Sequence, residues 1–139
     1  MIGLKSKETR GIAVLEVSGK LIGGPDSSER FRDYFKKLVA DGERKAVVDL
    51  RGATWATSQG IGMLIGAYTS MKNAGGELVL ASVGDRIKDI LNVTRLINIF
   101  ELFDNEDDAV KHLIGESGGS ANRQRLDTAP ELGTVRYIG

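Results

Sequence analysis

The sequence predicts an α/β fold, with a mixed, mostly parallel sheet of about four or five strands and about four helices packed on it. Short apolar runs rich in β-branched residues alternate along the chain with segments whose apolar residues recur at helical spacing. A helix that connects two parallel strands must bury its apolar stripe on the sheet. The length of 139 residues suits one domain with a single core.

The first part of the chain is predicted to form two strands and a helix. Residues 4–9 form a short edge strand, and residues 11–19 form a stronger one, because an apolar run is flanked there by glycines. After a loop, Asp26 is expected to cap a helix, with Glu29 in the capping-box position. That helix stops at residues 41–42. Its core-facing residues are expected to be Phe31, Phe35, Leu38 and Val39.

The central segment, residues 46–76, is predicted to form a strand, a polar turn and a helix. Residues 46–50 have strand length, the turn follows, and the helix begins around Thr57 and Ser58. The helix ends at residues 73–76, which tolerate left-handed backbone geometry. Its buried stripe is predicted to be Ile61, Leu64, Ile65, Tyr68 and Met71.

The last part of the chain repeats the alternation and then changes in composition. Residues 77–81 form a strand, a helix starts near residue 84, and residues 97–103 contain a last short strand. The helix buries Ile87, Ile90 and Leu91, and a closing helix is capped by Asp104 or Asn105. The segment 115–139 begins with a glycine- and serine-rich stretch and lacks periodicity, so we expect a flexible tail after a domain of residues 1–114.

Composition excludes several function classes. Lysine plus arginine equals aspartate plus glutamate at 19 each, which argues against nucleic acid as a partner because phosphate backbones attract a basic surplus. The absence of cysteine excludes disulfides, thiolate catalysis and cysteine-ligated zinc. No apolar run reaches the length of a membrane span, and the N-terminus lacks a secretory signal. We therefore expect a cytoplasmic protein.

The case for catalysis is weak. His112 is the only histidine, so no Ser-His-Asp triad is predicted, and its place late in a helix fits a surface or capping role. Carboxylates are scattered along the chain, and capping of turns and element ends explains them. We predict no catalytic residue, no metal site and no cofactor. The carboxylates in question are Asp26, Asp49, Glu77 and Asp85.

The spacing of glycines 60, 62 and 66 suggests a nucleotide-binding loop. The dinucleotide fingerprint fails because Ile65 occupies the position of its third glycine, and a P-loop would need a Gly-Lys-Ser/Thr ending. The favoured interpretation is that small residues let this helix approach the sheet closely. A small-molecule or nucleotide site at the helix start remains a distant alternative.

Three residues near this turn are candidates for function. Trp55 either packs over the strand-helix junction or, if exposed, anchors an interface. Thr57 and Ser58 provide hydroxyls at a helix start, where capping alone accounts for one of them.

The segment Val47-Val48-Asp49-Leu50, a short turn and Thr57-Ser58-Gln59-Gly60-Ile61-Gly62 resembles the STAS domains, and in particular the bacterial anti-sigma factor antagonists. Their pattern at the turn is Asp-Ser-Ser/Thr-Gly-Leu-Gly, and the resemblance runs from about Leu4 to Ile114. It implies a STAS-like fold and a binding protein, not an enzyme. The implied partner is an anti-sigma factor that is also a serine kinase, and a phosphatase resets the switch.

By the same resemblance, Ser58 is the phosphorylation site, with Thr57 as the alternative acceptor. The phosphorylated form releases the partner, and so regulates transcription by partner switching. The implied partner-binding residues are Gly24, Asp26, Thr57, Ser58, Gln59, Gly60, Ile61 and Gly62.

One departure from the family pattern keeps a second hypothesis open. Thr57 stands where the family has aspartate, and Gln59 follows the acceptor serine. The loss of that carboxylate fits a constitutive STAS interaction module, in a signalling scaffold or a transport complex, that binds without being phosphorylated.

Overall fold

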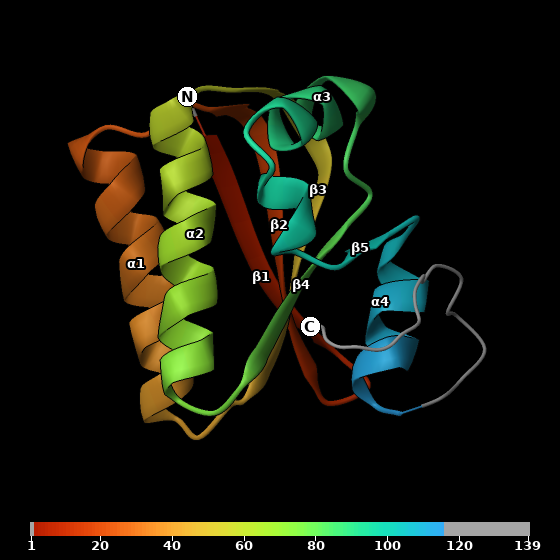
Figure 1. Ribbon diagram of the computed structural model, residues 1–139. Helices are drawn as coiled ribbons and strands as arrows, with labels where there is room; N and C mark the ends of the chain where they lie inside the picture. Colours follow the sequence, from red (N-terminus) through yellow and green to blue (C-terminus); the bar gives the residue numbers. More distant parts are fainter. Residues whose placement is uncertain (1, 116–139) are drawn as a thin grey trace.

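The structure is a computed structural model, and it describes residues 2–115. One sheet and the helices on its two faces make up this part of the chain (Figure 1). The strands are β1 (Ile2–Thr9), β2 (Ile12–Leu21), β3 (Lys45–Ala56), β4 (Glu77–Ala81) and β5 (Leu102–Phe103). The helices are α1 (Pro25–Ala40), α2 (Ser58–Asn73), α3 (Asp85–Val93), the 3₁₀ helix η1 (Leu96–Asn98) and α4 (Glu106–Leu113).

The strands lie in the order β1-β2-β3-β4-β5, which is their order along the chain. β1 and β2 form an antiparallel hairpin, and β2 to β5 are parallel, so the predicted mixed, mostly parallel sheet is confirmed. The crossovers all proceed in one direction across the sheet. Connections of the same handedness then place α1, α2 and α3 on one face and leave the other to α4 (Figure 1).

Two apolar cores follow from this arrangement. The larger core lies beneath α1, α2 and α3, and it contains Phe31, Leu64 and Ile87. The smaller core lies beneath α4. In β3 the side chains alternate between them: Val48 faces the larger core and Val47 the smaller. A central strand buried on both faces explains why four of the five residues at 46–50 are apolar, with Asp49 as the exception.

Several predicted boundaries are wrong. The turn expected after Leu50 is strand, because β3 continues to Ala56 alongside β2, with register irregularities at Glu16/Ser18 and Gly19/Lys20. The strand expected within residues 97–103 is reduced to the two residues of β5. Short glycine- and polar-rich stretches in a paired strand look like turns in sequence, since the pairing partner is not visible there.

The start of α1 also differs from the prediction. Gly24 is the N-cap residue, and no side chain caps this helix. Asp26 lies inside the first turn, so it is not the cap, and the capping box with Glu29 does not form. The left-handed backbone angles of Gly23 and Gly24 shape the entry to the helix, and they favour glycine at both positions. Asp26 still complements the helix dipole, because a carboxylate is favourable in a first turn.

No helix within residues 2–115 is long and apolar enough to cross a membrane. The tail predicted for residues 115–139 lies, apart from Gly115, outside the described residues.

Candidate functional site

The β2–β3 register positions the start of α2. Leu21 pairs with Ala56 at the ends of the two strands, and the amide of Thr57 donates to the carbonyl of Leu21 at 3.1 Å. The Thr57 hydroxyl donates to the carbonyl of Ile22 at 3.1 Å and accepts from the amide of Gly60 at 3.2 Å. Thr57 is therefore the N-cap of α2 and also ties the helix to the chain leaving β2.

Ser58, the first residue of α2, is in a different situation. It is exposed, and no hydrogen bond of its hydroxyl is found within the described part of the chain. The first turn of α2 contains no acidic residue, so the positive end of the helix dipole is not neutralised there by its own side chains. An anion attached to Ser58 would meet favourable backbone electrostatics.

The loop after β2 lies against the same turn. A Cβ placed on Gly23 would be 2.8 Å from the Cβ of Gln59, so the two residues are in close contact. The structure thus brings the loop that precedes α1 beside the start of α2. These two segments are more than 30 residues apart in the sequence, as the bond between Thr57 and Ile22 shows with a separation of 35.

The glycines of α2 divide into two kinds. Gly60 is buried, and a Cβ there would overlap the carbonyl oxygen of Leu21, which confirms a close approach of α2 to β2. Gly62 and Gly66 are exposed, and a Cβ added at either one would meet no atom within 4 Å, so close packing does not explain them. The predicted packing role is right for Gly60 and wrong for the other two.

Gly62 and Gly66 instead line a groove between α1 and α2, with a volume of about 620 Å³. The groove starts at the two helix N-termini and runs along both helices. Of the predicted partner-binding residues, Gly24, Gln59 and Gly62 line it. Gly60 and Ile61 are also predicted partner-binding residues, and both are buried.

Trp55 is exposed at 41%, and it does not pack over the strand-helix junction as the first interpretation expected. The guanidinium carbon of Arg86, in α3, lies 5.0 Å from the centre of its ring, a cation–π distance. Ile22 is also exposed, at 39%. Both exposed residues adjoin Thr57 through the backbone: Trp55 precedes it by two positions, and the carbonyl of Ile22 accepts its hydroxyl hydrogen bond.

Comparison with known proteins shows the family to which this fold belongs. The STAS domain family model matches residues 4–109. The chain belongs to the STAS domain family. The Anti-sigma F factor antagonist of Paenibacillus polymyxa is 23% identical over 111 residues, which cover 79% of this chain and 93% of that protein.

Solved structures of low sequence identity share the fold. An anti-sigma factor antagonist from Mycobacterium paratuberculosis has a TM-score of 0.70 at 22% identity, covering 82% of this chain and 95% of that one. The antagonist SpoIIAA in its unphosphorylated form has a TM-score of 0.64 at 15% identity, covering 81% of this chain and 99% of that one. SpoIIAA of Bacillus in the phosphorylated form has a TM-score of 0.63 at 15% identity, covering 79% of this chain and 98% of that one.

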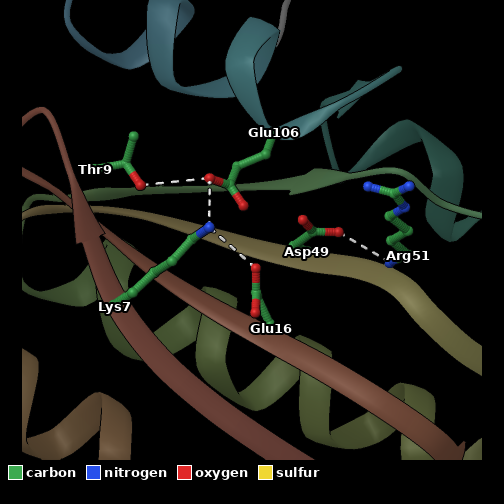
Figure 2. A network of polar contacts seen from close by, with 6 residues as sticks. All are labelled: Lys7, Thr9, Glu16, Asp49, Arg51 and Glu106. Carbon is green, nitrogen blue, oxygen red and sulfur yellow. Dashed lines mark hydrogen bonds and ion pairs between the residues drawn. The ribbon is translucent and has the colours of Figure 1, made fainter.

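A second polar site of this STAS domain lies on the α4 side of the sheet (Figure 2). The ammonium nitrogen of Lys7 lies 3.0 Å from a carboxylate oxygen of Glu16 and 3.0 Å from one of Glu106. The Glu106 and Glu16 carboxylates raise the pKa of Lys7 above its ordinary value. Thr9 donates to Glu106 at 3.4 Å. These contacts join β1 and the middle of β2 to the first residue of α4.

Asp49 lies beside this site and is 6% exposed. It is not at an element end, as the sequence suggested, but within β3, where its carboxylate accepts from the amide of Arg51 at 2.9 Å. Carboxylate oxygens of Glu16, Asp49 and Glu106 come within 4.8 Å of one another. Sequence reasoning missed this cluster because its members come from separate strands and a distant helix.

His112 belongs to a third polar cluster, on α4. Its Nε2 lies 3.0 Å from Oε2 of Glu77 and 3.3 Å from Oε1 of Glu101, and its ring packs on Phe103 with centres 5.0 Å apart. Hydrogen bonds with Glu101 and Glu77 raise the pKa of His112 to about 9. The sequence correctly predicted that His112 lies late in a helix. Its main interaction, however, is with the two carboxylates and not with the helix dipole.

Proposed function

We propose that this STAS domain is an anti-sigma factor antagonist whose binding to an anti-sigma factor is switched off by phosphorylation of Ser58. The observation that carries the proposal is the contrast between the two neighbouring hydroxyls. That of Thr57 is engaged in two hydrogen bonds, whereas that of Ser58 is exposed and makes none within residues 2–115. The contrast favours Ser58 over Thr57 as the acceptor.

The electrostatics of α2 support a switch that changes binding and leaves the fold intact. A phosphoserine adds about −1.5 to −2 charges at neutral pH. At the first position of α2 these charges face backbone amides and no carboxylate of the first turn. Repulsion and desolvation would then act on a partner that covers this surface, not on the packing of α2.

The proposed partner is a serine kinase that is itself the anti-sigma factor. It transfers the γ-phosphoryl group of its own ATP to the Ser58 oxygen, with ADP as the leaving group and the hydroxyl proton passing to a base of the kinase. A phosphatase hydrolyses the phosphoester and restores binding. The antagonist supplies the acceptor and the docking surface.

The docking surface is proposed to include the mouth of the α1–α2 groove and the apolar side chains beside it. Gly24, Gln59 and Gly62 line the groove. Trp55 and Ile22 have exposed side chains and lie in the two chain segments that meet at Thr57. A large aromatic side chain beside a polar acceptor is a suitable anchor for an interface. We therefore expect Trp55→Ala to weaken partner binding without affecting Ser58 exposure.

The test uses a kinase-type anti-sigma factor captured from the native host by the untagged chain. Incubation with ATP and Mg²⁺ should yield phosphoserine and no phosphothreonine, and Ser58→Ala should abolish transfer. Thr57→Ser is the matched control, because it keeps a capping hydroxyl and should leave phosphorylation intact.

Binding is then measured by calorimetry. We expect Ser58→Asp to weaken binding at least tenfold, a change of about 1.4 kcal/mol, and Ser58→Ala to bind like the wild type. Equal affinities of the wild type and Ser58→Asp would refute the switch.

Thr57 in place of the family's aspartate favours the second candidate, a constitutive STAS interaction module. Its N-cap role is fully met by threonine, so nothing in the fold requires a carboxylate there. Capture of one non-kinase partner by both the wild type and Ser58→Asp would support that candidate.

A further inference from the structure

We propose that Glu77, Glu101 and His112 form a binding site for a divalent transition-metal ion of the Zn²⁺ type. This site is independent of the proposed function because the two lie at opposite ends of β3. Glu77 pairs with Lys45, the first residue of β3, whereas Ser58 lies two positions after the last residue, Ala56. Eleven residue steps of strand separate the two ends, a distance of roughly 35 Å.

The donor set suits zinc. An imidazole nitrogen with two carboxylate oxygens gives three protein ligands, the number that zinc sites with an open fourth position use. The ligand atoms of the three residues lie within 4.8 Å of one another. Imidazole distinguishes this cluster from a purely acidic one, because it favours zinc and its neighbours over Mg²⁺ and Ca²⁺.

The distances fit a tetrahedral shell. With metal–ligand bonds of about 2.1 Å, two ligands at the tetrahedral angle are about 3.4 Å apart. Nε2 of His112 is 3.0 Å from the Glu77 oxygen and 3.3 Å from the Glu101 oxygen. A metal ion can therefore replace the shared proton with small side-chain adjustments. On binding, the Nε2 proton passes to the buffer, and the nitrogen lone pair forms the bond to the metal.

The three ligands come from three elements that the fold holds together. Glu77 is the first residue of β4, Glu101 immediately precedes β5, and His112 lies in the last turn of α4. The helix α4 lies beside β5 in Figure 1. The ring of His112 is seated on Phe103. Lys45 donates to the carbonyl of Leu113 at 2.6 Å and fixes the end of the same helix. The imidazole is thus oriented before a metal arrives, which lowers the entropic cost of binding.

Exposure allows a metal to enter. The side chains of His112, Glu77 and Glu101 are 32%, 40% and 51% exposed. The Glu16, Asp49 and Glu106 cluster differs in this respect, because the ammonium of Lys7 already lies 3.0 Å from two of its carboxylates. The ammonium of Lys7 already occupies the position between those carboxylates, so the proposal is confined to the His112 site.

The experiment is a titration of the untagged, full-length chain with ZnCl₂, monitored by the ¹⁵N signals of the imidazole. His112 is the only histidine, so the spectrum contains a single ring. We expect a saturable shift of Nε2 at micromolar zinc, no shift with MgCl₂, and a higher melting temperature with zinc. An unshifted ring at millimolar zinc would overturn the proposal without any variant.

Variants then test the carboxylates. Glu77→Gln and Glu101→Gln should each weaken zinc binding at least tenfold, since each removes an anionic ligand and keeps the shape of the side chain. Glu16→Gln is the matched control from the other cluster and should bind zinc like the wild type. If neither Glu77→Gln nor Glu101→Gln changed zinc binding, the imidazole would be the only ligand among the three residues, and the proposed site would be refuted.

Discussion

Two glycines that are two positions apart on α2 are predicted to respond to alanine with opposite signs. At Gly60, an added Cβ would overlap the carbonyl oxygen of Leu21 and lie 2.5 Å from its carbonyl carbon, closer than the 3.0 Å that real Cβ atoms respect. The obstacle is backbone in the paired strand β2, so α2 itself must move. Forced shifts of this kind cost about 1–3 kcal/mol or more. Gly60→Ala should therefore destabilise the domain by at least that amount.

Gly62→Ala is the matched control. A Cβ there meets nothing within 4 Å, and the residue lies in the interior of α2. Removal of glycine's conformational freedom from a helix interior should stabilise the fold by about 0.5–1 kcal/mol. Urea denaturation measures both changes, provided that the slope of the transition is unchanged. If Gly60→Ala were as stable as the wild type, or Gly62→Ala were the less stable of the two, the described packing of α2 on β2 would be wrong.

Two further predictions concern polar side chains. Thr57→Ala should cost about 1 kcal/mol, because it removes the N-cap acceptor of α2, and Thr57→Ser should restore most of it in the same urea assay. The carboxylates of Glu101 and Glu77 raise the pKa of His112 in the folded protein to about 9, against 6.5 for the free side chain. Its contribution to the free energy of unfolding is therefore complete below pH 6.5 and is lost as the pH rises through 9. After a discount for partial exposure, we expect the free energy of unfolding of the wild type to fall by about 1–2 kcal/mol relative to that of His112→Gln between these two pH values. The measurement is made with a chelator present. Parallel pH profiles of the two proteins would contradict the assignment.

Local patterns were sufficient to predict most of the fold. The strands that read most clearly in the sequence are those buried on both faces, such as β3, where Val47 and Val48 belong to different cores. The N-cap roles of Thr57 and Asn105 follow from the same local chemistry, since each side chain accepts from an amide three residues later. These features depend on residues near one another in the chain.

The errors arise where a distant segment decides the outcome. The residues after Leu50 look like a turn, yet β2 pairs with them as far as Ala56. Asp26 looks like a cap, yet the backbone of Gly23 and Gly24 places the helix start one residue before it. Pairing partners and entry angles of this kind are set by tertiary structure, which a single sequence does not display.

The same distinction applies to the polar sites. The Ser58 turn could be located from the sequence because the N-cap, the proposed acceptor and the glycines are contiguous. The contrast between the Thr57 and Ser58 hydroxyls, however, depends on the carbonyl of Ile22, 35 residues away. The His112 cluster has no local signature at all, since its carboxylates lie at the start of β4 and before β5. The parallel sheet brings these positions together at one edge. A site assembled by strand order in this way can be recognised only once the topology is known.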